Sequence, residues 1–184
     1  MCSLALPTKM RRLVEVRAVS LDDAIAETGR EAPVGESALD TPSDHVARNR
    51  EQLERLRRLV ARLSDDDLKR ELPDGWTIAD ALAHLAFYDR RAQILLERFA
   101  REGVFASPYD YETINAALPH LTRRIPPREI AAEVLEAAEA ADRAAAATPA
   151  TLVEEIRRLN QVKLERADHR RSHLDDIEAL LESP

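Results

Sequence analysis

Cysteine, glycine and aromatic residues are scarce in this chain, and each scarcity narrows the class of protein. A single cysteine, Cys2, among 184 residues excludes an internal disulfide and favours a reducing cytoplasm. Four glycines and an aromatic content of 4%, beside many Ala, Leu, Glu and Arg, favour helices over sheets. The length suits one domain with a sizeable core and room for an additional arm.

An excess of positive charge and long hydrophobic runs are also missing. The net charge is −7 and the isoelectric point about 5.3, whereas a nucleic-acid-binding domain usually carries a basic stripe. The sequence contains no run of about 18 apolar residues, so a membrane span is not expected. The first residues lack the order of a signal peptide. The composition therefore predicts a cytoplasmic protein that binds neither nucleic acid nor a membrane.

The chain divides into two parts by composition. Residues 1–42 mix glycine, proline, serine and acidic residues without a sustained apolar period, which is typical of a flexible N-terminal arm. From residue 43 onward, apolar residues recur at helical spacing. We therefore expect the folded domain over residues 43–184.

Four long amphipathic helices are predicted, over residues 43–64, 76–103, 128–148 and 161–182, with short helical segments near 109–118 and 149–160. We expect Ser43 to cap the first helix. Thr77 and Asp80 have the spacing of a capping box at the start of the second, and Gly103 is placed to end it. Four such helices with uneven connectors predict an all-α fold, a four-helix bundle.

Three of the five histidines border the predicted core. His84 lies within the apolar stripe of the second long helix, and His169 and His173 are four residues apart on the last. A spacing of four gives an angular offset of about 40° and a rise of about 6 Å, so both rings point the same way. Three imidazoles from two helices have the ligand count of an open zinc site, although nickel, iron and copper also accept imidazole.

The residues alone leave a second interpretation of these histidines open. A histidine in an apolar stripe is often a hydrogen-bonded core residue, and a pair spaced by four also arises on a polar helix face. We assign His45 to a polar helix start and His120 to a loop after Pro119, without a role in a metal site.

Two motifs then indicate a family. "GWTIADALAHLAFYDRR" and "ADHRRSHLDDIEALL" together resemble the DinB-like superfamily, which includes the N-terminal domains of mycothiol-dependent maleylpyruvate isomerases. The resemblance implies an up-down-down-up four-helix bundle over roughly residues 43–182, with a divalent-metal site. The family's ligand positions correspond here to His84, His169 and His173. The C-terminal domain of the full isomerases has no counterpart in this sequence. Conversely, residues 1–42 of this sequence have no counterpart in the family.

The resemblance implies a metal-dependent enzyme, with a low-molecular-weight thiol such as mycothiol as co-reactant and a small electrophile as substrate. The reaction would be a transfer or isomerisation, the metal zinc, nickel or iron, and a homodimer is left open. The alternative is a non-catalytic bundle that binds a small molecule or a protein, with a vestigial or absent metal site. A third interpretation makes the histidines a buried polar network in a dimerising bundle.

Several residues near the histidine motifs have both a functional and a structural interpretation. Carboxylates within a turn of the histidines are candidate hydrogen-bond acceptors for metal-bound imidazoles: Asp80, Glu165 and Asp176. Two residues are candidates to line a pocket, Tyr88 and Asn115, and Trp76 is expected to plug the start of the second helix. Four arginines flank the ligand helices and are candidates to bind an anion: Arg90, Arg91, Arg170 and Arg171. For the carboxylates and the arginines a solvated surface position is the favoured interpretation, and for Tyr88 and Asn115 a structural contact.

Overall fold

The computed structural model describes residues 42–182, so the predicted arm and Cys2 lie outside the described residues. The described part is all-helical and contains no strand, which confirms the predicted all-α class. Its elements are α1 (Pro42–Arg62), the 3₁₀ helix η2 (Asp67–Lys69), α2 (Ile78–Glu102), α3 (Tyr111–Thr122), α4 (Pro127–Ala146), α5 (Ala150–Leu159) and α6 (Ala167–Glu182). None of these helices is both long enough and apolar enough to cross a membrane.

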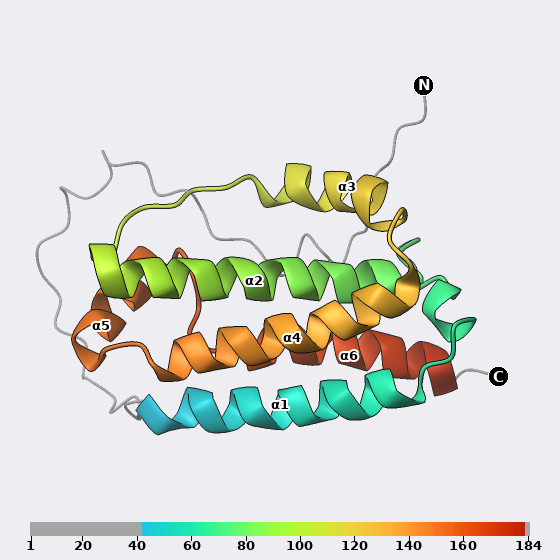
Figure 1. Cartoon of the computed structure of the whole chain (residues 1–184), viewed down its shortest axis with the longest axis horizontal. Helices are drawn as coiled ribbons and strands as arrows, with labels where there is room; N and C mark the ends of the chain where they lie inside the picture. Colours follow the sequence, from blue (N-terminus) through green and yellow to red (C-terminus); the bar gives the residue numbers. More distant parts are fainter. Residues whose placement is uncertain (1–41, 183–184) are drawn as a thin grey trace, which may run out of the picture. The chain divides into compact units, whose positions relative to one another are not determined.

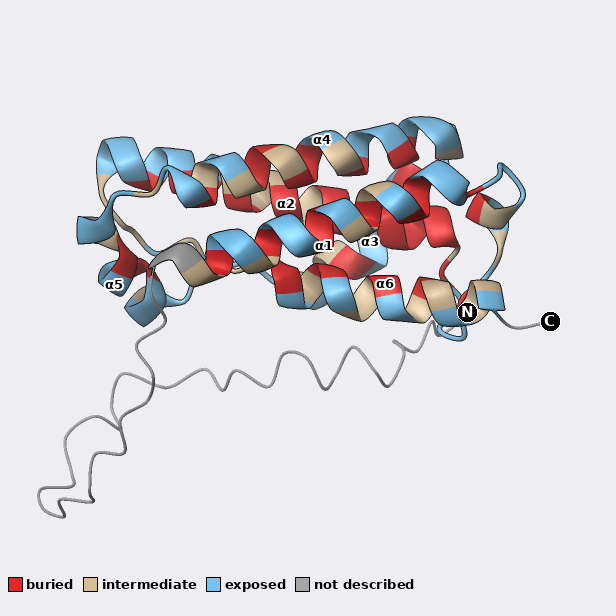
Figure 2. Ribbon diagram, turned by 90° about the horizontal axis from the view of Figure 1, so that it is seen from below, coloured by how far each residue is buried: buried red, intermediate tan, exposed pale blue. Residues whose placement is uncertain are grey.

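Four of the helices, α1, α2, α4 and α6, lie side by side (Figure 1). The closest packing is between α2 and α4, and α1 contacts both α4 and α6. In Figure 1, α1 and α6 run in one direction and α2 and α4 in the other, while α3 lies along the outside of α2. The buried faces of these helices point inward, toward one another (Figure 2).

The helix that carries His84 begins and ends where the sequence predicts. The Thr77 side chain accepts a hydrogen bond from the backbone N–H of Asp80 at 3.0 Å, and the Asp80 carboxylate accepts one from the Thr77 N–H at 3.1 Å. At the other end Gly103 has a φ of 80°, a conformation that favours glycine, and its N–H donates to the Phe99 carbonyl. The capping box and the glycine stop are therefore both confirmed.

The predicted last helix is shorter than expected. It begins at Ala167, and residues 161–166 approach it in an irregular conformation. Val162 and Leu164 are buried in this segment, in an apolar cluster with side chains of α2, α4 and α5. Asn49 of α1 accepts hydrogen bonds from the backbone N–H groups of Arg166 and Ala167 at 2.7 and 3.0 Å. Packing across the molecule thus fixes where α6 starts.

Three smaller expectations are also corrected. The first helix begins at Pro42, so Ser43 lies inside its first turn and not ahead of it. The segment α3 extends through Pro119, which places His120 in a helix and not in a loop, and His120 is exposed. His45 is buried within α1, because it lies on the same side of the helix as the buried Asn49 and Gln52.

Candidate metal centre

The structure brings His84, His169 and His173 together from two helices. His84 lies on the capped N-terminal half of α2 and is only 4% exposed, whereas the other two lie in the first turns of α6 and are partly buried. One ring nitrogen from each of the three lies within 4.8 Å of those of the other two. The spacing of four on α6 turns its two rings to the same side, as expected from the sequence.

The rings meet through their edges. The Nε2 atoms of His84 and His169 are 2.9 Å apart, and the ring centroid of His173 lies 4.8 Å from that of His84 and 5.1 Å from that of His169. Two nitrogens bound to one zinc ion in tetrahedral geometry lie about 3.4 Å apart, given zinc–nitrogen bonds of about 2.1 Å. The donor set therefore fits a cation after small movements of the three rings.

The surroundings keep the imidazoles of His84 and His169 neutral. Burial, with a smaller contribution from the neighbouring His173, lowers the pKa of His84 to about 3, against a small opposing effect of the Asn115 side chain. Burial also holds the pKa of His169 well below its usual range, aided by His173 and Arg166. A cation competes poorly with a proton for a ring nitrogen, so neutral rings at pH 7 favour metal binding.

Aromatic side chains cover the histidine cluster. The Trp76 ring meets the ring of His84 edge-on with centroids 5.2 Å apart, and the Tyr88 ring lies 4.7 Å from His84 and 5.6 Å from His169. The Tyr88 hydroxyl donates to the Asn115 side-chain oxygen at 3.0 Å, which ties α2 to α3. Burial raises the pKa of Tyr88, so the hydroxyl remains a donor. Tyr88 and Asn115 thus lie beside the cluster and form the structural contact that the sequence favours for them, while a pocket-lining role stays a prediction.

Two of the three candidate acceptor carboxylates have structural roles. Asp80 caps α2 and forms a hydrogen-bonded ion pair with Arg123 at 3.0 Å. Glu165 precedes α6 and pairs with Arg48 of α1 through two hydrogen bonds of 2.6 and 2.7 Å. For Asp80 the favoured solvated position is wrong, because its side chain is buried; Glu165 is partly exposed. Asp176 is half-buried on α6, and its role stays a prediction.

The four arginines near the histidines separate into two kinds. Arg90 and Arg171 form ion pairs at the surface, with Glu133 and Asp168 respectively, as the solvated interpretation expects. Arg91 is half-buried: it donates to the carbonyls of Ser107 and Gln161, and its guanidinium stacks 3.9 Å above the centroid of the Tyr109 ring.

Arg170 contradicts the solvated interpretation, because it is fully buried. Its guanidinium pairs with Asp89 of α2 and Asp142 of α4, each at 2.9 Å. Asp89 is also fully buried, and Arg166 pairs with it at 2.8 Å.

Sequence reasoning missed both Asp89 and Arg166. A signal existed for Asp89, which lies four residues after Leu85 and three before Ala92 on the buried side of α2. A comparable signal existed for the burial of Arg170, whose spacing from Leu174 and Ile177 places it on the core face of α6.

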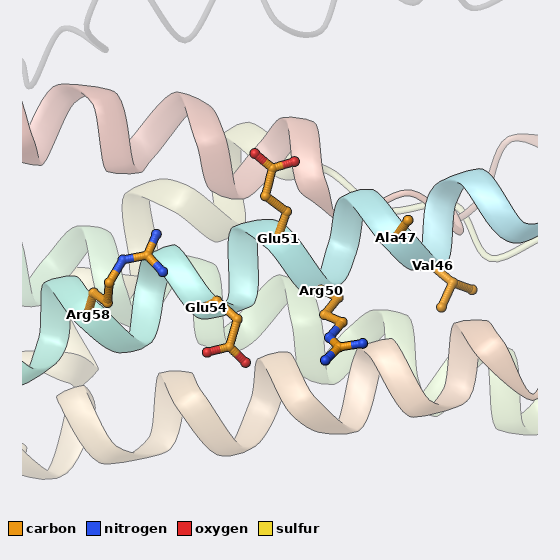
Figure 3. A pocket seen from close by; sticks show the side chains of 6 residues that line it. All are labelled: Val46, Ala47, Arg50, Glu51, Glu54 and Arg58. Carbon is orange, nitrogen blue, oxygen red and sulfur yellow. The ribbon is translucent and has the colours of Figure 1, made fainter.

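A shallow hollow lies on the surface of α1, away from the three histidines. It is lined by side chains of α1 that are all exposed, and it contains none of the three histidines (Figure 3): Val46, Ala47, Arg50, Glu51, Glu54 and Arg58. Among the described residues, the group of side chains placed to hold a metal ion is that of the three histidines, and it is not in this hollow.

A comparison of the sequence with known families finds a match. The sequence model of the mycothiol maleylpyruvate isomerase N-terminal domain matches residues 49–158. The chain belongs to this family. The match includes His84 and the aromatic cover from α2 but ends before His169 and His173, so those two positions rest on the structure and the H-x-x-x-H spacing. No curated protein and no solved structure is significantly similar to the chain.

Proposed function

We propose that this protein is a metal-dependent enzyme in which His84, His169 and His173 hold a divalent cation, zinc, nickel or iron. The observation that carries the proposal is the convergence of three imidazoles from two helices, within 4.8 Å of one another. The lowered pKa of His84 and of His169 supports it, because neither ring carries the second proton of an imidazolium, which would leave no lone pair for a cation. When bound, the cation would lower the pKa of a thiol or a water and supply a nucleophile near neutral pH.

The residues around the cluster would prepare the site for such chemistry. Trp76 and Tyr88 exclude water from the rings of His84 and His169, which strengthens electrostatic interactions inside the site. The Tyr88 hydroxyl donates its one proton to Asn115, so on the edge of the cluster it offers an oxygen that can accept a hydrogen bond. We assign Tyr88 the binding of a polar group of the substrate.

Family membership supports a finer proposal. The co-reactant is a low-molecular-weight thiol, mycothiol or a relative of it, and the reaction is a transfer or isomerisation of a small electrophile. Residues 43–184 form the domain, and the directions of α1, α2, α4 and α6 support a DinB-like, up-down-down-up four-helix bundle. The proposal includes a cytoplasmic location, and a homodimer is compatible with it.

Elemental analysis of untagged protein tests the metal assignment. We expect about one equivalent of metal in the wild type, its loss in His169→Ala, and its retention in His120→Ala, which removes an exposed histidine of α3. If the wild type is metal-free and binds no metal on titration with zinc, nickel or iron, the proposal of a metal-dependent enzyme is wrong. The non-catalytic binding bundle then becomes the better assignment. Thiol-dependent turnover of reactive electrophiles by the loaded protein separates an enzyme from a binding module.

A further inference from the structure

The guanidinium of Arg166 lies between a buried carboxylate and one of the candidate metal ligands. Its Nε donates to Asp89 at 2.8 Å, and its Nη2 lies 3.2 Å from Nδ1 of His169. Arg166 is only 8% exposed and Asp89 is fully buried, so the pair is held firmly. The second oxygen of Asp89 accepts from Arg170 at 2.9 Å, which fixes the carboxylate from the other side.

This contact determines which nitrogen of His169 carries the proton. A guanidinium has only donors, so the Nδ1 of His169 accepts from Arg166 and the neutral ring is protonated on Nε2. That Nε2–H points to the Nε2 of His84, 2.9 Å away, which must then be the acceptor. His84 consequently carries its own proton on Nδ1, a buried atom without a hydrogen-bond partner among the described residues.

The two rings therefore differ in their readiness for a cation. His84 has an unprotonated Nε2, as a ligand requires. His169 has the opposite tautomer: its Nε2 must lose the proton, and Nδ1 must gain one, before Nε2 can bind a metal ion. A metal-bound histidine usually donates its other N–H to an acceptor, but His169 faces a donor there.

We propose that Arg166 is a positioning residue that sets the tautomer of His169 and thereby restrains capture of a cation by the three-histidine site. The inference rests on the proposed metal function for its consequence, but the tautomer itself is a property of the metal-free protein. On metal binding the Arg166–His169 hydrogen bond must break, and the guanidinium keeps Asp89 as its partner. Cation capture is in this way coupled to the buried ion pairs between α2 and α6.

Two measurements on the full chain test this inference. In the metal-free wild type, ¹⁵N shifts of the histidine rings should show His169 protonated on Nε2, and Arg166→Gln should shift it toward the Nδ1–H form, because a glutamine oxygen can accept that proton. Zinc titrated against a chromophoric chelator should bind Arg166→Gln about tenfold or more tightly than the wild type, since a charge-assisted hydrogen bond no longer opposes it. The matched control is Arg171→Gln, which removes the same charge from an exposed position on α6 and should leave the dissociation constant unchanged.

The outcomes separate this inference from the proposed function. A wild-type His169 protonated on Nδ1, or an Arg166→Gln protein that binds zinc no more tightly than the wild type, would overturn the role of Arg166. If no form of the protein binds zinc, the metal proposal fails, and the ring shifts of the wild type alone decide whether Arg166 sets the tautomer.

Discussion

Burial lowers the pKa of His84 to about 3 because the ring sits between Trp76, Tyr88 and the α6 histidines, where a positive charge would lose its hydration. In the unfolded chain the same side chain has a pKa near 6.5. Below about pH 6.5 the unfolded state therefore takes up a proton that the folded state does not. The contribution of His84 to the free energy of unfolding is complete above that pH and is lost as the pH falls from about 6.5 toward 3.

The pH dependence of unfolding tests this assignment in protein freed of metal by a chelator. Between pH 6.5 and 4.5 the free energy of unfolding should fall, with a share from His84 of about 1.4 kcal/mol per pH unit. His84→Gln should remove that share of the slope, whereas His120→Gln, at an exposed site on α3, should not. Urea unfolding followed by the fluorescence of the single tryptophan, Trp76, measures both slopes. Equal slopes in the wild type and His84→Gln would contradict the assignment.

The candidate site could be predicted in part because its main signal is local. The spacing of His169 and His173, and the place of His84 in an apolar stripe, depend only on helix periodicity. The role of Arg166 could not be predicted in this way. It depends on where Asp89 of α2 lies relative to the start of α6, which is set by packing between segments 77 residues apart.

At the scale of helices, the sequence predicted α2 from end to end because its signals lie in its own residues, Thr77, Asp80 and Gly103. The start of α6 has no such local signal. Val162 and Leu164 are apolar and read as one more turn of helix, yet they are buried against α2, α4 and α5 in an irregular segment. The residue that satisfies the first N–H groups of α6, Asn49, comes from α1.

Asn49→Ala should therefore weaken the start of α6, two residues before His169. It removes the acceptor for two buried N–H groups and the donor to the Leu164 carbonyl at 2.9 Å. We expect a loss of about 2–3 kcal/mol in the free energy of unfolding, from buried groups left without partners. Amide exchange at the first turn of α6 should accelerate more than exchange in α2. Asn49→Asp, which keeps the acceptor, should retain more protection there. Uniform acceleration in both helices would argue against a local cap.

At the scale of the whole molecule, the core contains a network of ionic side chains that joins three helices. Asp89 of α2 accepts from Arg166 and Arg170, and Arg170 also pairs with Asp142 of α4 and donates to the Ala138 carbonyl at 3.1 Å. Arginines with several donors can satisfy carboxylates and carbonyls from different helices at once. Such a network fixes the relative register of α2, α4 and α6, and the position of the histidines depends on that register.

Removing the charge at the centre of this network should be costly. In Asp89→Asn, two guanidinium groups lose their shared carboxylate, and Arg170, fully buried, keeps only Asp142 as an ionic partner. Breaking a buried ion pair from one side typically costs about 3–5 kcal/mol, because a charge is left uncompensated away from water. We expect a large fall in the urea midpoint of Asp89→Asn, while Glu102→Gln, which breaks the surface pair with Arg98 on the same helix, should leave the midpoint unchanged. If the two variants unfold at the same urea concentration, the buried network does not hold α2, α4 and α6 in register.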